Sequence, residues 1–503
     1  MGRETRRIAL LYRGPQQESR DEFTGFVPVG LFHVLKSLLQ AGYCATLHNL
    51  SELPAKRLKE AIGDTCADAV LISAFYGAHH QALLLARTVK QVLPKAPVVL
   101  GGPVAVLGES LLRRTKEIDF IIRGEGEEAT VRLLDALFGG DGQLAAIGGL
   151  IHRHGHTVRS VPPELLADLD RFAFLPSEVL PHCHQVRPEN LAVLISSRGC
   201  PYRCAFCSSS VLWQNRVRHH QVGLLIDYLK DLRRTTGALY FSMRDENFLV
   251  DRCHVQAFCQ ALEQSGLHYL WNAQGSPHLI DDEMAGILAG AGCDQVQMGI
   301  ETVSPRLQQL LAKRSDAGRV REACATLRRQ AIRPFGYFIY GMGETDAEAR
   351  DNCTFIKGGE LLDAVVSPLV LYPGTSLAQG VAEERFFGRG EVLYFDPASR
   401  TRLQPVYEAA LRSLLNRAAF RRKELFSAAA ASHCVATVAR HYHYLGQDNV
   451  AAAEGELRGL IKREPSNPWG YRLAAELLAE LGRHAEAKSL QRQADHLAGQ
   501  RPA

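Results

Sequence analysis

The sequence predicts an α/β protein with two successive parallel-sheet domains followed by a helical region. Three observations lead to this fold class. Short apolar runs of strand type alternate with helical patterns over residues 1–140 and again over residues 191–380, and this alternation is typical of parallel sheets. Glycine pairs follow several of the runs. Beyond residue 380, apolar residues recur mainly at helical spacing.

The composition is that of a globular chain of several domains. Hydrophobic residues make up 46% of the 503 residues and charged residues 22%, which excludes a disordered or fibrous chain. The formal net charge of +4 is too balanced to indicate general nucleic-acid binding. With no signal-peptide pattern and no apolar stretch of ~18 residues, we expect a cytoplasmic protein without a membrane span. Its 12 cysteines are then expected to be reduced thiols, some of them metal ligands.

Residues 1–140 are expected to form a doubly wound sheet. Helical patterns at residues 29–41 and 81–93 separate some of the apolar runs. The runs predicted as strands are residues 7–12, 44–50, 69–73, 96–100 and 118–122. Ligands of such sheets bind at the carboxyl ends of the strands. Gly101-Gly102 and the run RGEGEE at residues 123–128 fall at these ends.

A second α/β domain is expected after a linker. Residues 141–190 contain Gly and Pro pairs and several histidines, which favours an irregular connection between domains. In the domain at residues 191–380, the runs predicted as strands are residues 191–196, 238–242, 268–272, 295–300, 334–340 and 364–371. About six β/α units fit a partial or full barrel of the TIM type, whose site lies on the carboxyl-end loops.

Residues 381–503 are expected to be a helical region. The helix predicted at residues 403–426 carries a basic cluster, which favours a solvated face over an anion site; its members are Arg412, Arg417, Arg421, Arg422 and Lys423. Leu445-Gly446 and Leu481-Gly482 lie 36 residues apart, and an Ala-rich helical pattern follows each. This spacing is near the ~34 residues of a tetratricopeptide unit. Residues 440–497 are therefore predicted to be tetratricopeptide-like, with an ordinary helical hairpin as the alternative.

The most specific chemical feature is the run SRGCPYRCAFC at residues 197–207. It places Cys200, Cys204 and Cys207 at the spacing Cys-x3-Cys-x2-Cys. Thiolates at short, fixed spacing hold iron–sulfur clusters, usually four of them, so three ligands would leave one iron open. Structural zinc commonly needs a second pair of ligands, and the sequence has no second CxxC pair. The spacing predicts a cluster with one open iron.

This spacing, with Phe206 directly before the third cysteine, resembles the radical S-adenosylmethionine (SAM) superfamily. In that family the cysteines hold a [4Fe-4S] cluster whose open iron chelates the amino and carboxylate groups of SAM. Reduction then cleaves SAM to methionine and a 5′-deoxyadenosyl radical. The resemblance implies the same roles for Cys200, Cys204 and Cys207, and an external electron donor of the flavodoxin or ferredoxin type.

Later segments resemble further motifs of the family in the same order, so that the resemblance covers about residues 190–376. FSMRDENF at residues 241–248 is similar to an acidic segment near the SAM amino group; its pair is Asp245-Glu246, and which of the two contacts SAM stays open. QMGIET at residues 297–302 implies a SAM contact by Glu301, and the basic pair Lys313-Arg314 follows it. GYFIYGMG at residues 336–343 and LYPGT at residues 371–375 resemble the next strand and the closing turn.

The first domain resembles the cobalamin-binding domain that precedes many radical SAM barrels. The resemblance is carried by Pro28-x-Gly30, VLIS at residues 70–73, Gly101-Gly102-Pro103 and Gly124-Glu125-Gly126. It implies that these glycine-rich strand ends let the backbone approach a large flat ligand closely, and that the loop at residues 73–80 lies against the corrin. Ser73 and Tyr76 are the candidate contacts in this loop. A degenerate domain that no longer binds the cofactor is the alternative.

Histidines of the first domain are weaker candidates for cofactor contacts. The motif Asp-x-His-x-x-Gly, which supplies an axial histidine in other cobalamin proteins, is absent, so cobalt is expected to be bound without a histidine ligand. His48, His79 and His80 remain candidates for contacts on the cobalt side or with the corrin. Most histidines are ordinary surface or hydrogen-bonded residues, and this is the favoured interpretation for each.

Together the resemblances imply a cobalamin-dependent radical SAM enzyme that methylates an unactivated carbon of a natural-product, lipid or peptide intermediate. The substrate is expected to be a small molecule or to be bound to a carrier or peptide, and nucleic acid is not expected as a partner. A cyclase or rearrangement enzyme of the same architecture stays open. A methylthio-transferring tRNA enzyme is disfavoured, because it normally needs three more cluster cysteines and residues 1–140 hold only Cys44 and Cys66. The intact cysteine triplet argues against a tetratricopeptide-type interaction protein with an inactive barrel.

Overall fold

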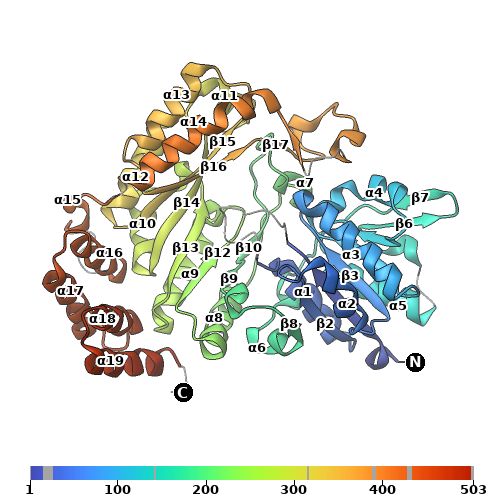
Figure 1. The fold of residues 1–503 in the computed structure, drawn as a ribbon, viewed down its shortest axis with the longest axis horizontal. Coiled ribbons are helices and arrows are strands. Elements are labelled where there is room, and N and C mark those ends of the chain that lie inside the picture. Colours follow the sequence, from blue (N-terminus) through green and yellow to red (C-terminus); the bar gives the residue numbers. More distant parts are fainter. Residues whose placement is uncertain are drawn as a thin grey trace. The chain divides into compact units, whose positions relative to one another are not determined.

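The computed structural model describes residues 2–14, 26–140, 143–313, 316–387, 392–417, 419–427 and 433–499. The chain divides into two compact units, each discontinuous in sequence. The first unit contains residues 1–191, 206–216 and 370–393, and the second contains residues 192–205, 217–369 and 394–503. Each unit is built on a largely parallel sheet (Figure 1). The α/β fold class predicted from the sequence is confirmed.

The first unit has an eight-stranded sheet in the order β7-β6-β5-β4-β3-β1-β2-β8. Its strands are β1 (Arg7–Tyr12), β2 (Cys44–Asn49), β3 (Ala69–Ser73), β4 (Val98–Gly101), β5 (Phe120–Ile122), β6 (Leu150–His154), β7 (Thr157–Ser160) and β8 (Cys183–His184). The strands β1 to β5 are parallel, and β1, β3 and β4 are strongly apolar, because helices cover both faces of such a sheet.

Helices connect the strands of the first unit. They are α1 (Val29–Gln40), α2 (Leu58–Gly63), α3 (His79–Val92), α4 (Gly108–Arg114), α5 (Glu127–Gly139), α6 (Pro176–Val179) and α7 (Ser209–Trp213). Helix α1 packs with α5, and α2 packs with α3. Right-handed crossovers from β1 in the two directions place these pairs on opposite faces of the sheet.

Residues 141–190 differ from the irregular linker expected from the sequence. Strands β6 and β7 form an antiparallel hairpin that extends the sheet at β5, and β8 pairs with β2 at the other edge. Phe172 and Phe174 are buried, and the ring of Phe174 lies 5.9 Å from that of Phe32 on α1. The strands are short and rich in His, Arg and Thr, so their apolar pattern is too weak to mark them.

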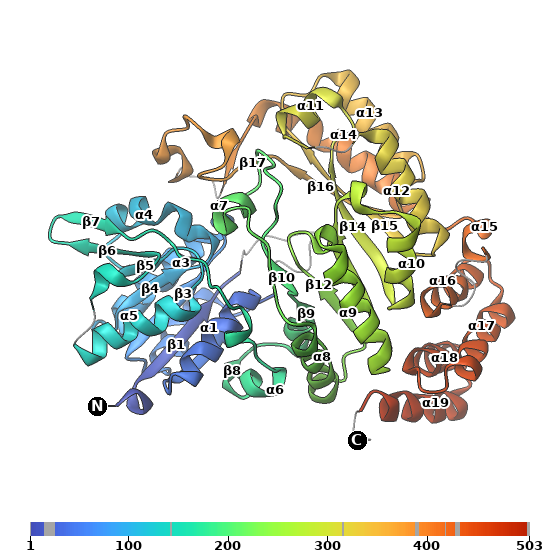
Figure 2. The same ribbon diagram turned by 180° about the vertical axis from the view of Figure 1, so that it is seen from behind.

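The second unit has a six-stranded sheet in the order β16-β15-β14-β13-β12-β9, which is the predicted partial barrel (Figure 2). Its strands are β9 (Val193–Leu194), β12 (Tyr240–Met243), β13 (Leu270–Gly275), β14 (Cys293–Glu301), β15 (Arg333–Tyr340) and β16 (Asp363–Pro368). All neighbouring strands in it are parallel. The connecting helices are α8 (Val222–Thr236), α9 (Arg252–Ser265), α10 (Asp282–Gly290), α11 (Pro305–Leu310), α12 (Ala317–Arg329) and α13 (Asp346–Lys357).

Two small strand pairs complete the sheets, and the first of them is antiparallel. The first joins β10 (Ser197–Arg198) to β11 (Arg218–His219), and the second joins β17 (Val370–Leu371) to β18 (Leu393–Tyr394). The pair β10–β11 directly precedes the cysteine run in the chain. It therefore sets the backbone from which that run departs.

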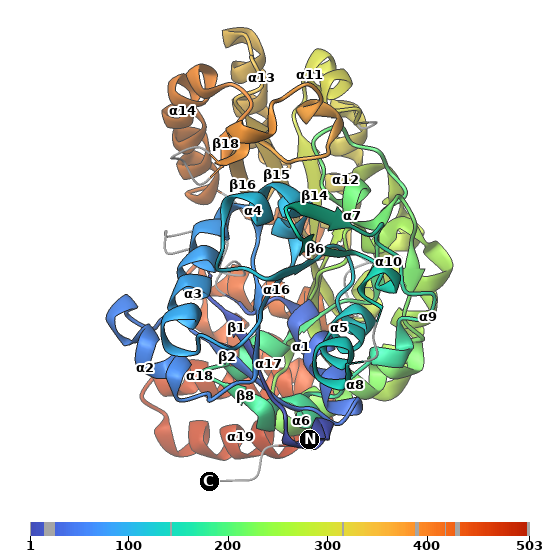
Figure 3. The ribbon, with the colours of Figure 1, turned by 90° about the vertical axis from the view of Figure 1, so that its right-hand side faces the viewer.

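The C-terminal region is helical, as predicted, but the single helix expected at residues 403–426 is two helices. The elements are α14 (Pro397–Leu415), α15 (Arg422–Leu425), α16 (Cys434–Leu445), α17 (Val450–Arg463), α18 (Pro468–Glu480) and α19 (His484–Leu497). Helix α14 packs against α13 and β16 (Figure 3). None of the helices in the described ranges is both long and apolar enough to cross a membrane.

Helices α16 to α19 form two successive hairpins, α16 with α17 and α18 with α19. The first helices of the hairpins start 34 residues apart, at Cys434 and Pro468, which is the period of tetratricopeptide units; the assignment itself stays a prediction. Trp469 Nε1 donates to His268 O at 3.0 Å, just before β13. Arg233, at the end of α8, donates to Leu497 O. The hairpins thus bind the barrel at the amino ends of its strands.

Candidate functional site

The cysteine run begins directly after β10, at Gly199, whose φ of +101° turns the chain. The second unit contains Cys200 and Cys204, whereas Cys207 belongs to the segment 206–216 of the first unit, as does the half-buried Phe206. All three cysteines are free thiols and half-buried. Burial raises the pKa of Cys200 and of Cys204, and the nearby Lys313 ammonium acts in the opposite direction on both.

Three contacts within the second unit hold the first part of this run. Gly199 N donates to Glu246 Oε2 at 2.8 Å. The hydroxyl of Tyr202 and His278 Nε2 form a hydrogen bond of 2.7 Å, and Ala205 N donates to Leu311 O at 2.9 Å. The loop around Cys200 and Cys204 is therefore held at its start, middle and end by three different elements.

The two acids of the FSMRDENF segment have different surroundings. Asp245 is 0% exposed. Its Oδ1 accepts from Ser196 N at 2.7 Å, and its Oδ2 accepts from the hydroxyls of Ser196 and Ser197, each at 2.6 Å. Burial raises the pKa of Asp245 to about 6, against the lowering effect of the serine bonds. Glu246 is exposed, so of the two only Glu246 can be reached by a ligand.

Glu301 ends β14 in a strained conformation. Its φ of +64° is unusual for a residue other than glycine, and it coincides with a register shift against β15. Lys313 Nζ lies 3.2 Å from Glu301 Oε1. A Cβ at Gly299 would lie 2.7 Å from that same oxygen, so the glycine of the GIET run leaves room for the pair. Burial raises the pKa of Glu301, while Lys313 lowers it; Arg314 lies outside the described residues.

In the first unit, the predicted glycines stand at strand ends. Gly101 ends β4, and Gly102 has φ +80° and ψ −176°, a conformation open essentially to glycine alone. A Cβ on Gly102 would lie 2.6 Å from Ser73 Oγ, at the end of β3. Pro103 begins the 3-10 turn Pro103–Leu107. The ends of β3 and β4 therefore lie so close together that only a glycine fits at position 102.

The second predicted glycine turn follows β5. Gly124 has φ +95°, and Gly126 precedes helix α5, where a Cβ would lie 3.2 Å from Val34 Cγ2. Between them Glu125 is buried, and its Oε2 accepts from Leu166 N at 2.6 Å. Glu125 therefore fastens the segment that follows β7, and the two glycines allow the tight turn.

Both the barrel and the first domain match families of known proteins. The family model "Radical SAM superfamily" matches residues 194–356, and the model "B12 binding domain" matches residues 25–134. The chain thus carries both a radical SAM domain and a B12-binding domain. Its cofactors are therefore a [4Fe-4S] cluster, SAM and cobalamin, as the resemblances to these families implied.

Named relatives of this radical SAM chain include methyltransferases and a cyclase. The "Uncharacterized methyltransferase PH0819" of Pyrococcus horikoshii is 29% identical over 355 residues, covering 70% of this chain and 77% of the relative. The anaerobic magnesium-protoporphyrin IX monomethyl ester cyclase of Synechocystis is 26% identical over 371 residues, covering 71% and 73%. The structure of the radical SAM methyltransferase TsrM from Kitasatospora setae, with cobalamin and [4Fe-4S] cluster bound, has a TM-score of 0.65 at 17% identity, covering 88% and 95%.

The resemblance to B12-binding domains places cobalamin at the carboxyl ends of the strands of the first unit. The loop after β3 brings Phe75 to the surface with 42% exposure, directly beyond the glycine-packed end of β4. Tyr76, the expected contact, is buried instead, 5.6 Å from the ring of Tyr372 and 6.1 Å from that of Phe386. Phe75 is therefore the aromatic side chain of this loop that can face a corrin; the sequence signal was an aromatic pair directly after a strand.

The three histidines proposed as weak cofactor contacts have ordinary partners. His79 Nδ1 lies 3.0 Å from Tyr76 O, and His80 Nε2 lies 3.0 Å from Gln81 Nε2. His48 stacks on His184 with ring centroids 4.5 Å apart and bonds to Thr46 Oγ1 at 2.9 Å.

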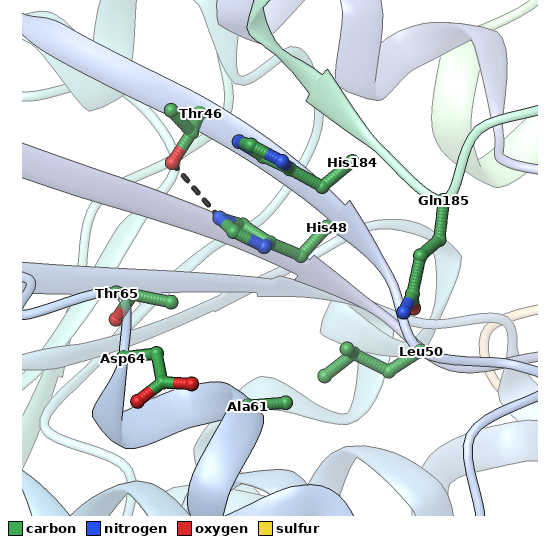
Figure 4. Close-up of a pocket in the computed structure, with 8 residues that line it drawn as sticks. All are labelled: Thr46, His48, Leu50, Ala61, Asp64, Thr65, His184 and Gln185. Atoms are coloured by element: carbon green, nitrogen blue, oxygen red, sulfur yellow. Dashed lines mark hydrogen bonds between the residues drawn. The ribbon is translucent and has the colours of Figure 1, made fainter.

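His48 and His184 line a cavity of about 460 Å³ at the β2–β8 edge (Figure 4). Burial lowers the pKa of His48 to about 4, so its ring is neutral at pH 7. Across the described ranges, no three His, Cys, Asp or Glu side chains are grouped as ligands of a metal ion. The cavity lies at the edge strands of the sheet, away from the glycine turns after β4 and β5.

The interior of the radical SAM barrel carries a polar network that the sequence did not reveal. Arg244 Nη1 donates to Gln297 Oε1 at 3.1 Å, and the Tyr337 hydroxyl donates to the same oxygen at 3.0 Å. Gln297 Nε2 donates in turn to Gln295 Oε1 at 2.9 Å. Barrel interiors are more often filled with branched aliphatic side chains. Here strands β14 and β15 present hydrogen-bonding groups inside the barrel.

Proposed function

We propose that this radical SAM enzyme transfers a methyl group to an unactivated carbon of its substrate. The observation that carries the proposal is the presence, in one chain, of the cysteine run and of a B12-binding domain with its glycine-packed strand ends. The 29% identical methyltransferase of Pyrococcus horikoshii supports methyl transfer. When bound, the cluster with SAM supplies a radical that removes a hydrogen atom, and cobalamin supplies the methyl group.

The chain's own residues have separate tasks in this proposal. Cys200, Cys204 and Cys207 would ligate three irons of the cluster. The exposed carboxylate of Glu246 and the Glu301–Lys313 pair would bind the amino and carboxylate ends of SAM, since they offer opposite charges at the carboxyl ends of β12 and β14.

The substrate we propose is a natural-product, lipid or peptide intermediate with polar groups, free or attached to a carrier. The hydrogen-bonded side chains Arg244, Gln297 and Tyr337 inside the barrel support this, because buried polar groups discriminate strongly against ligands that leave them unmatched. The electron donor would be a flavodoxin or ferredoxin.

The cyclase relative from Synechocystis favours a second candidate, a radical cyclisation or rearrangement without methyl transfer. No residue type described above separates the two reactions, because both begin with the same hydrogen abstraction. The products separate them, since only methyl transfer consumes a second SAM and forms S-adenosylhomocysteine.

The test is anaerobic reconstitution with iron, sulfide and hydroxocobalamin, followed by mass spectrometry of the products from SAM and dithionite. Methyl transfer predicts 5′-deoxyadenosine and S-adenosylhomocysteine, with cobalamin retained after desalting. Cys204→Ala should abolish deoxyadenosine, whereas Cys44→Ala, at an exposed thiol of the first unit, should leave it unchanged. Deoxyadenosine with retained cobalamin but without adenosylhomocysteine would favour the cyclase; deoxyadenosine without retained cobalamin would refute methyl transfer.

A further inference from the structure

The strand end that leads into the cysteine run is buried. Ser196 and Ser197 are fully buried. In the small sheet, Ser197 pairs with His219, and His220 N donates to Ser196 O at 2.8 Å. Asp245 accepts from the amide and hydroxyl of Ser196 and from the hydroxyl of Ser197. The backbone four residues before Cys200 is thus fixed by side chains as well as by strand pairing.

The hydrogen bonds at the Ser196 hydroxyl show which nitrogen of the His254 ring carries the proton. A serine hydroxyl has one proton, and that of Ser196 points to Asp245 Oδ2 at 2.6 Å. His254 Nε2, on helix α9, lies 3.1 Å from the same Oγ. With the hydroxyl proton already used, Nε2 must be the donor. Burial lowers the pKa of His254 to about 4, so the ring is a neutral Nε2–H donor at neutral pH.

His219 extends this arrangement to the start of helix α9. Its ring lies 4.3 Å from that of His254, and its Nε2 lies 3.2 Å from Asp251 Oδ2. Asp251 also caps α9 by accepting from Cys253 N and His254 N. A chain of contacts therefore runs from the start of helix α9 to the strand end before the cluster loop, through Asp251, His219, His254, Ser196 and Asp245.

We propose that His254 is a positioning residue for the iron–sulfur cluster, acting through Ser196 and Asp245 to orient the loop that carries Cys200. Its hydrogen bond goes to Ser196, four residues before Cys200. Its Nε2–H keeps the Ser196 hydroxyl turned toward Asp245, which leaves the Asp245 oxygens engaged with the serines. This role requires only cluster ligation, so it holds whether the enzyme methylates or cyclises.

The test compares His254→Leu with His254→Gln by hydrogen exchange of the peptide around Ser196 in the cofactor-free protein, and by electron paramagnetic resonance of the reduced, reconstituted cluster. One lost neutral hydrogen bond predicts about fivefold faster exchange of the Ser196 amide in His254→Leu. It also predicts an altered cluster spectrum. His254→Gln should restore both, because its amide NH2 can donate to Ser196 Oγ.

The control is His441→Leu, which removes another buried imidazole of the second unit, one that bonds to Ala453 O at 3.1 Å in the C-terminal hairpins. It should lower the thermal midpoint without changing exchange at Ser196 or the cluster spectrum. If His254→Leu does not fold, Ser196→Ala removes the same hydroxyl and should give the same two changes. Unchanged exchange and an unchanged spectrum in the folded variant, or failure of His254→Gln to restore them, would overturn the proposal.

Discussion

Replacing Asp245 by Asn tests the buried carboxylate on which the cluster loop rests. Asp245 is 0% exposed and accepts three hydrogen bonds. Burial nevertheless outweighs these bonds and raises its pKa from 3.8 to about 6. Asn keeps the shape and an acceptor for Ser196 N, and the two serine hydroxyls can turn to accept from its NH2 group. The substitution therefore removes the charge while retaining most of the contacts.

The magnitude follows from the two pKa values. An acid whose pKa is higher in the folded chain than in the unfolded chain binds more protons when folded, so its ionisation destabilises the fold as pH rises between these values. A difference of about two pKa units corresponds to about 3 kcal/mol, of which about 2 kcal/mol develops between pH 4.5 and pH 7.5. Relative to the wild type, Asp245→Asn should thus gain about 2 kcal/mol of unfolding free energy over this range.

The assay is urea unfolding of the cofactor-free protein, followed by tryptophan fluorescence; two of the three tryptophans, Trp271 and Trp469, lie in the second unit. The pH series is measured for the wild type, for Asp245→Asn and for Asp227→Asn, a control at an exposed helix position. Because other groups titrate too, the quantity to compare is the difference between variant and wild type at each pH. If the curves of unfolding free energy for wild type and Asp245→Asn run parallel from pH 4.5 to 7.5, the pKa of Asp245 is not raised, and burial does not outweigh its three hydrogen bonds.

Three further substitutions test other parts of the site. Gly102→Ala changes a residue whose conformation is reserved for glycine and places a Cβ 2.6 Å from Ser73 Oγ. It should lower the free energy of unfolding by about 2 kcal/mol or more and reduce the cobalamin retained after desalting; retention equal to that of the wild type would contradict this. Gly299→Ala places a Cβ 2.7 Å from Glu301 Oε1 and should slow SAM cleavage at least tenfold with normal iron content, so a rate within twofold of wild type would speak against the proposed SAM contact. Burial lowers the pKa of His48 to about 4, below the unfolded value of 6.5. His48 therefore adds up to about 3 kcal/mol to the free energy of unfolding above pH 6.5, and this contribution is lost as pH falls through 4. His48→Asn should therefore flatten the pH dependence of hydrogen exchange in β2 between pH 7 and 4.5, and equal slopes in variant and wild type would exclude this role.

Strands buried on both faces are the ones that the sequence marks most clearly. β1 and β3 are apolar along most of their length, and a parallel sheet covered by helices requires this pattern. The hairpin β6–β7 was not predicted because it extends the sheet at an edge, where about half of its residues face solvent. Tertiary pairing makes these segments strands, and tertiary pairing leaves little trace in local periodicity.

The cluster ligands could be predicted because their chemistry constrains spacing within one loop. Contacts made across the fold could not. His254 and Ser196 are 58 residues apart and meet through a hydrogen bond that neither local sequence marks. Tyr76 and Phe75 show the same limit on a smaller scale: both follow β3, and only the packing of residues 372 and 386 decides that Tyr76 is buried and Phe75 exposed.

Asp245 and Glu246 show why an acidic pair in a motif need not act as a pair. Asp245 and Glu246 lie just beyond β12, and only Glu246 is exposed, so a ligand can reach only one of the two adjacent acids. Asp245 points into the protein, where only hydroxyl and amide donors make its burial tolerable. Glu246 points outward and binds Gly199 N with one oxygen. The acid that reaches outward and the acid that holds the cluster loop are therefore different residues, Glu246 and Asp245.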